Sequence, residues 1–189
     1  MGRDGRAAGR AGEHRAGVAA TTFDPKQGAD RPVFFHESVH AVFAHDVRLL
    51  TGHDHQSWLH EGLAAYLQVC VFPRSLDPRM LPPQFARPIP ADGSGTFLPL
   101  GALMTKRVST KHYAQLVTLM AYLVEEKPQW LPVVAQALAD GKRVEQALEA
   151  CGTTAAELEA EWFKWGKARF RPGDGKPAFP QPDEFRGEN

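Results

Sequence analysis

The chain has 189 residues, of which 43% are hydrophobic and 23% are charged, so it is long enough for one domain with a buried core. Its 22 Lys and Arg residues balance 22 Asp and Glu residues, which gives no electrostatic reason to expect nucleic acid or an anionic membrane as a partner. No run approaches the ~18 consecutive apolar residues of a membrane span, so we expect a globular protein without a membrane-spanning segment.

Residues 1–30 are expected to form a flexible N-terminal arm, because the first 17 are rich in Gly, Arg and Ala and have no hydrophobic period. Residues 17–25 are compatible with one short strand, since they include the β-forming types Val18 and Phe23. The arm contains no apolar core of a secretory signal peptide. The location in the cell is therefore unknown, and we expect the cytoplasm unless the N-terminus is truncated.

Two consecutive helices are predicted after the arm. The first is expected over residues 32–50, because Pro32 suits the first helical turn and Asp30 lies near the N-cap. The second is expected over residues 57–71, with Ser57 as its N-cap after a short polar connection. A connection of this length lets two helices pack side by side.

The rest of the chain alternates between an irregular segment and further helices. Seven prolines between Pro73 and Pro99 predict a loop, which we expect to form one wall of a cleft. Helical periodicity returns over residues 98–108, 112–126, 130–140, 144–151 and 155–170, the last helix being capped by Thr153 or Thr154. Residues 171–189, rich in Pro, Gly and charge, are expected to be disordered. The predicted fold is mainly α, with at most one or two vestigial strands near the N-terminus.

The first predicted helix carries the pattern His-Glu-x-x-His, from His36 to His40. Residues four apart lie on the same face of a helix, so both imidazoles can reach one metal ion at ~2.0–2.1 Å. Glu37 lies about 100° round the helix, where a general base can take a proton from a metal-activated water. Only about 0.02 such matches are expected by chance at this length and composition, which favours a metal site.

A catalytic metal site needs a third protein ligand, and Glu61 is the candidate. It follows His40 after 20 intervening residues, on the first turns of the second predicted helix. Packing of the two helices would bring its carboxylate opposite the histidines, and a metal cation would compensate the buried negative charge. Its neighbours Trp58 and Tyr66 are expected to pack in the core between the helices.

Four further histidines lie near the predicted site. His53 and His55 are expected to be solvated loop residues, and His45 is expected to project away from the metal-binding face. His60 precedes Glu61 directly and is expected either beside the ligands or facing a substrate.

The segment WLHEGLAAYL, from Trp58 to Leu67, together with HESVH, resembles the gluzincin zinc metallopeptidases. In this family, which includes aminopeptidase N-like enzymes and small bacterial domains, His-Glu-x-x-His is followed by a helix of the form Trp-Leu-x-Glu-Gly-x-Ala-x-Tyr. The resemblance implies a zincin-like helical metallopeptidase domain over residues 31–170. It implies that Zn²⁺ is bound by His36, His40 and Glu61.

Within the same resemblance, Glu37 is the general base. The segment HYAQLVTLMAYL, which starts at His112, is similar to a helix of the family that begins with a catalytic tyrosine. This implies that Tyr113 donates a hydrogen bond to the oxyanion of a tetrahedral intermediate.

The expected function is therefore zinc-dependent hydrolysis of a peptide bond in a peptide or protein substrate. An alternative is a zinc-binding but inactive domain that acts as an interaction or structural module. Gluzincins have a β-sheet subdomain before the active-site helix, whose edge strand binds the substrate, and only 31 residues precede Pro32 here. A hydrolase acting on other bonds and a helical protein without a metal are further alternatives. The oligomeric state and the cleavage specificity stay open.

Overall fold

The computed structural model describes residues 12–15, 18–21, 32–47, 54–76, 81–95, 97–170 and 179. Over these ranges the protein is mainly helical, which confirms the predicted fold class. None of the described helices is both long and apolar enough to cross a membrane. The elements in chain order are β1 (Gly12–Arg15), β2 (Val18–Thr21), α1 (Val33–Val42), a π-helix (Phe43–Val47), α2 (Asp54–Val71), a 3₁₀ turn (Pro73–Ser75), α3 (Leu81–Phe85), α4 (Leu100–Met104), a second 3₁₀ turn (Thr110–His112), α5 (Tyr113–Glu126), α6 (Trp130–Ala139), α7 (Val144–Glu149) and α8 (Ala155–Arg169).

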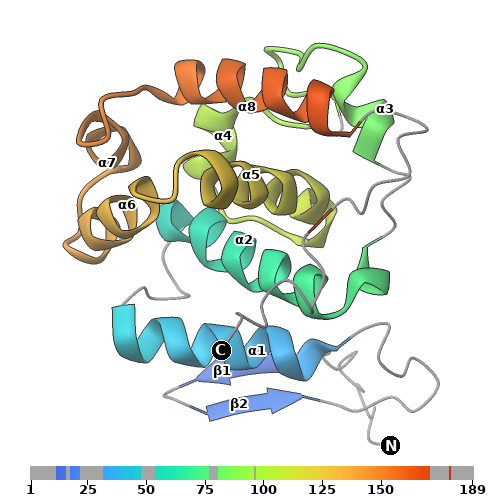
Figure 1. The fold of residues 1–189 in the computed structure, drawn as a ribbon. Helices are drawn as coiled ribbons and strands as arrows, with labels where there is room; N and C mark the ends of the chain where they lie inside the picture. Colours follow the sequence, from blue (N-terminus) through green and yellow to red (C-terminus); the bar gives the residue numbers. More distant parts are fainter. Residues whose placement is uncertain are drawn as a thin grey trace, which may run out of the picture.

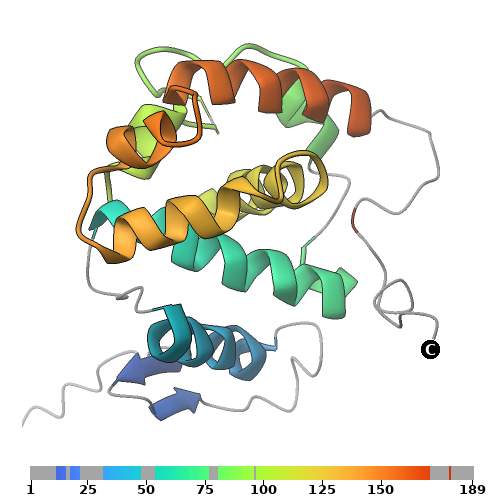
Figure 2. The same ribbon diagram turned by 60° about the vertical axis from the view of Figure 1, so that its left-hand side comes forward.

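The helices form stacked layers, with the β-hairpin at one end of the molecule and α8 at the other (Figure 1). In both views α1 lies between the hairpin and α2, and α5 lies between α2 and α8 (Figure 2). Because α2 packs on α1 and on α5, it is covered on both sides. From Gln56 to Tyr66 every residue of α2 is buried except Glu61, which is half-buried.

The described part of the N-terminal arm contains two strands, which is within the one or two that the predicted fold allows there. β1 and β2 pair antiparallel, with Arg15 opposite Val18, and the hairpin packs against α1. β2 lies inside the strand predicted over residues 17–25, whereas the assignment of residues 12–15 to a flexible arm is wrong. The residues of β1 have weak β propensity, so its pairing with β2 and the contact with α1 favour the strand. The other arm residues lie outside the described ranges.

The boundaries of the first two helices differ from the prediction. Pro32 is the N-cap of α1, and Asp30 lies outside the described residues. α2 begins at Asp54, three residues before the predicted start, so the assignment of Ser57 as N-cap is wrong. Ser57 is buried, and its hydroxyl oxygen accepts a hydrogen bond from the backbone N–H of Val108 at 3.2 Å. The hydroxyl therefore accepts a hydrogen bond from a distant part of the chain and does not cap its own helix.

The Pro-rich segment contains the short helix α3, which the sequence analysis treats as loop. Proline is tolerated in the first turn of a helix, where its missing N–H has no intrahelical partner. α3 packs on α8, and the backbone of Leu98 exchanges two hydrogen bonds with the side chain of Gln115 in α5. Figure 1 places α3 beside α8, at the end of the stack away from α1. The short helix α3 thus belongs to the α8 end of the stack, and the cleft wall expected from this segment stays a prediction.

The C-terminal helices agree closely with the prediction. Gly141 and Gly152 follow α6 and α7 with φ of 79° and 75°, a backbone conformation that glycine adopts without strain. Thr154 is the N-cap of α8, in a capping box with Glu157. The predicted disorder of residues 171–189 lies outside the described residues, except for Phe179, whose buried ring lies 5.9 Å from that of Phe170.

Candidate metal centre

Two histidines of α1 face α2. His36, Val39 and His40 form the buried face of α1, at the spacing of three and four residues that places side chains on one side of a helix. Only 6% of the surface of His36 and 4% of that of His40 are exposed. Both imidazoles are therefore removed from water and need polar partners inside the protein.

Glu61 of α2 supplies the partner for both imidazoles. Its Oε2 lies 3.2 Å from Nε2 of His36, and its Oε1 lies 3.5 Å from Nε2 of His40. The Glu61 side chain is 27% exposed, so the group stays open to solvent on one side. The three side chains predicted from the sequence as metal ligands are thus together in space.

The three residues could hold a metal ion, because their ligand atoms all lie within 4.8 Å of one another. Ligands bound about 2.0–2.2 Å from a tetrahedral ion lie about 3.3–3.6 Å apart, which matches the measured nitrogen–oxygen distances. An imidazole lone pair and a carboxylate oxygen repel each other unless a proton or a cation lies between them. Both the spacing and the donor chemistry fit a bound cation.

The pKa of the Glu61 carboxyl also fits a cation at this site. Burial alone raises the pKa of its carboxyl, but hydrogen bonds from His36, His40 and Tyr113, with the charge of His40, outweigh burial and hold the pKa well below its usual value. The site therefore favours the carboxylate form, which is the form that binds a metal.

Tyr113, the first residue of α5, reaches the same cluster. Its hydroxyl donates a hydrogen bond to Oε2 of Glu61 at 2.7 Å and lies 3.3 Å from Nε2 of His36. Burial, followed by the charge and hydrogen bond of Glu61 and the charge of Glu37, raises the pKa of the phenol far above its usual value. Tyr113 therefore keeps its proton and remains a hydrogen-bond donor.

Glu37 lies beside this cluster rather than within it. It is half-buried on α1, and it does not belong to the group of three convergent ligands. Its charge is one of the causes of the raised pKa of Tyr113, so its carboxylate lies within electrostatic range of that hydroxyl. This position, next to the ligands but not among them, is the one that the sequence pattern predicts for a proton acceptor.

The remaining histidines divide between surface and core. His45 is exposed on the π-helix, His55 is half-buried on α2 instead of lying in a loop, and His53 lies outside the described residues. His60 is buried, and its ring stacks on that of His40 with centroids 4.3 Å apart and planes 25° apart. The position of His60 directly before Glu61 predicts that it lies near the ligands, but no signal in the sequence predicts the stacking. Trp58 and Tyr66 are buried in the core as predicted.

Comparisons with protein-family models, with curated proteins and with solved structures find no match for this chain.

Proposed function

We propose that this protein is a zinc-dependent peptidase whose metal is held by His36, His40 and Glu61. The observation that carries the proposal is the convergence of two imidazole Nε2 atoms and one carboxylate, with Glu37 directly beside the first ligand. Imidazole and carboxylate donors in a set of three suit a catalytic Zn²⁺ site. Bound zinc would supply Lewis acidity, which polarises a carbonyl group and lowers the pKa of water.

The side chains around the metal would handle the protons. Glu37 is half-buried, so its carboxylate can accept a proton from the attacking water and pass it to the leaving amine. Tyr113 keeps its proton because its pKa is raised, and its hydroxyl donates a hydrogen bond to Glu61 in the protein without substrate. The same hydroxyl can donate to the oxyanion that develops on the substrate carbonyl once its bond to Glu61 is exchanged. The Glu61 side chain is 27% exposed, so a peptide could reach the cluster from the solvent side.

Metal content is the first test of the proposal. Protein purified without chelator is expected to contain about one zinc ion per chain by inductively coupled plasma mass spectrometry. A His36→Ala/His40→Ala double variant, folded by circular dichroism, is expected to contain none. A wild-type protein without zinc, even after zinc is supplied, would overturn the proposal.

Hydrolysis is tested separately by Glu37→Gln, which keeps the size of the side chain but removes the proton acceptor. Release of new amino groups from a peptide mixture is expected to fall about 10²–10⁴-fold, while zinc content stays that of the wild type. Glu145→Gln, an exposed change on α7, is the matched control and is expected to change neither readout. Retained hydrolysis in Glu37→Gln would contradict the role of Glu37 as the proton acceptor. Zinc without hydrolysis in the wild type would favour the inactive zinc-binding domain instead.

A further inference from the structure

Each of the two histidines of the candidate metal centre has an aromatic ring stacked on it. Tyr113 lies on His36, with centroids 5.5 Å apart and planes 19° apart. His60 lies closer to His40, at 4.3 Å and 25°. The two stacked rings come from different helices, α5 and α2, so each histidine is flanked by a neighbouring layer of the fold.

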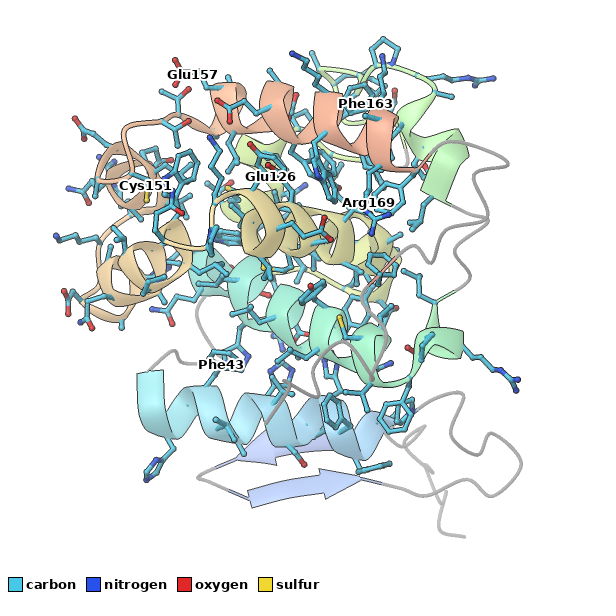
Figure 3. The ribbon with its side chains drawn as sticks, in the orientation of Figure 1. Phe43, Glu126, Cys151, Glu157, Phe163 and Arg169 are labelled. Atoms are coloured by element: carbon cyan, nitrogen blue, oxygen red, sulfur yellow. The ribbon has the colours of Figure 1, made fainter. Side chains whose placement is uncertain are left out.

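The His60 ring is itself enclosed. It is 1% exposed, and the edge of the Phe43 ring lies against it with centroids 6.5 Å apart. Figure 3 shows Phe43 in the space between α1 and α2. Phe43 follows His40 by three residues, so α1 and its π-helical extension bring His40 and Phe43 to the same side, where both meet His60. The His60 ring is therefore packed between two rings and has little freedom to turn.

The second ring nitrogen of each histidine, Nδ1, shows why the stacked rings matter for orientation. Histidines that bind metals usually donate a hydrogen bond from that nitrogen, which sets the orientation of the ring. Within the described part of the chain, neither Nδ1 of His36 nor Nδ1 of His40 has a hydrogen-bond partner. The rings of His60 and His36 pack against His40, and these contacts add to that of its Nε2 with Glu61 in orienting the imidazole.

We propose that His60 is a positioning residue for the metal centre, whose stacked ring holds the His40 imidazole with Nε2 directed at the ion. His60 does not belong to the group of convergent ligand atoms, so it acts through His40. α2 then contributes twice, because it carries the ligand Glu61 and, one residue earlier, the ring that orients another ligand. This inference rests on the proposed metal site but not on peptidase activity.

The test compares two apolar replacements of His60 that differ in shape. His60→Leu keeps much of the buried volume but removes the flat ring, and its affinities for Zn²⁺ and Co²⁺ are expected to fall about 10–100-fold. His60→Phe restores a flat ring that can stack, and its affinities are expected to lie within about threefold of the wild type. Dissociation constants are measured by competition with a chelating dye.

The visible absorption of the Co²⁺ form adds a readout that a loss of general stability would not change. At saturating Co²⁺, the bands are expected to shift or weaken in His60→Leu and to match the wild type in His60→Phe, because they report how the ligands surround the ion. Leu59→Ala, at a fully buried position on the same helix, is the control. It is expected to lower the melting temperature while leaving the Co²⁺ spectrum and the affinities unchanged.

Two outcomes would overturn the role of His60. One is a folded His60→Leu protein with wild-type affinity and spectrum. The other is a His60→Phe protein that binds as weakly as His60→Leu, which would mean that stacking is not the cause. A wild-type protein that binds neither ion would instead refute the metal site itself, so the two failures are distinguishable.

Discussion

The two ends of the helical stack bury very different side chains. Between α1 and α2, the buried groups include the polar rings of His36, His40 and His60. Between α3 and α8, the rings of Phe85 and Trp162 lie 5.3 Å apart at the centre of an aromatic cluster. The other members of that cluster are Phe97, Phe163 and Phe170.

Burial has opposite consequences at these two ends. An aromatic ring gains free energy when it leaves water and needs no polar partner. Imidazole and carboxylate groups lose hydration on burial, and this cost must be offset by hydrogen bonds or by a metal ion. The α3–α8 end therefore stabilises the fold by itself, whereas the contribution of the α1–α2 end depends on how its buried polar groups are paired. We therefore expect that a substitution in the aromatic cluster changes the stability but not the zinc affinity of the folded protein.

The largest expected effect is at the aromatic end. A Cβ atom at Gly166 would overlap the ring of Phe85, which is buried and cannot move aside. Gly166→Ala is therefore expected to lower the free energy of unfolding by about 3 kcal/mol, as overpacking of a core does. Denaturation by urea measures the loss, and the zinc affinity of the folded protein should stay unchanged.

Gly101→Ala is the matched control for this variant. Its new Cβ would lie 3.9 Å from Cβ of Ala155, an ordinary contact, on an exposed side of α4. Since Ala favours a helix over Gly, the variant is expected to keep or slightly raise the stability. Equal losses in the two variants would show that the Gly166 contact is not the cause, and a weaker zinc affinity in Gly166→Ala would show that the two ends are coupled.

A somewhat smaller effect is expected from the metal. Zinc at about 100 times its dissociation constant should raise the free energy of unfolding by about 2.7 kcal/mol, because it binds the folded state only. Thermal unfolding with and without zinc measures this gain. The His36→Ala/His40→Ala variant should show no gain, and a gain that survives in that variant would place the bound zinc elsewhere.

The smallest of the three effects concerns the hydroxyl of Tyr113 in the metal-free protein. Tyr113→Phe removes a hydrogen bond to the largely buried carboxylate of Glu61, so unfolding is expected to become easier by about 1.5 kcal/mol. Tyr122→Phe is the control, because its hydroxyl donates at the same 2.7 Å to Glu161, whose side chain is 48% exposed. An exposed partner is rehydrated after the change, so the loss should stay below about 1 kcal/mol. Equal losses would contradict the buried character of the Glu61 bond.

Local signals in the sequence were sufficient for the helices from α5 onward, whereas the helix predicted over residues 98–108 is the shorter α4, Leu100–Met104. Apolar residues at helical spacing predicted α5, and Gly141, Gly152 and Thr154 marked the ends of α6, α7 and α8. The extent of burial was not predicted. The pattern in α5 indicates one apolar face, yet every residue from Gln115 to Leu123 is buried, because α2 and α8 cover it from two sides.

In the candidate site, too, local features could be predicted from the sequence and contacts between helices could not. The spacing of His36 and His40 and the helix that carries Glu61 could be recognised from the sequence, since both depend on helical geometry along one segment. The contact of Tyr113 with Glu61 joins residues 52 positions apart, and the stacking of His60 on His40 joins two helices. Neither contact has a periodic signal in the chain.

The sequence by itself determined where the helices from α5 onward begin and end and which three side chains form the candidate metal centre, because caps, helix-breaking residues and four-residue spacing act over a few positions. Only the tertiary structure decided what surrounds that centre. The packing of α1, α2 and α5 left Glu61 as the one half-open position within the buried part of α2, turned Ser57 to the backbone of Val108, and placed a ring against each histidine. These features arise where helices distant in the chain meet, and burial there is set by neighbours that no local pattern encodes.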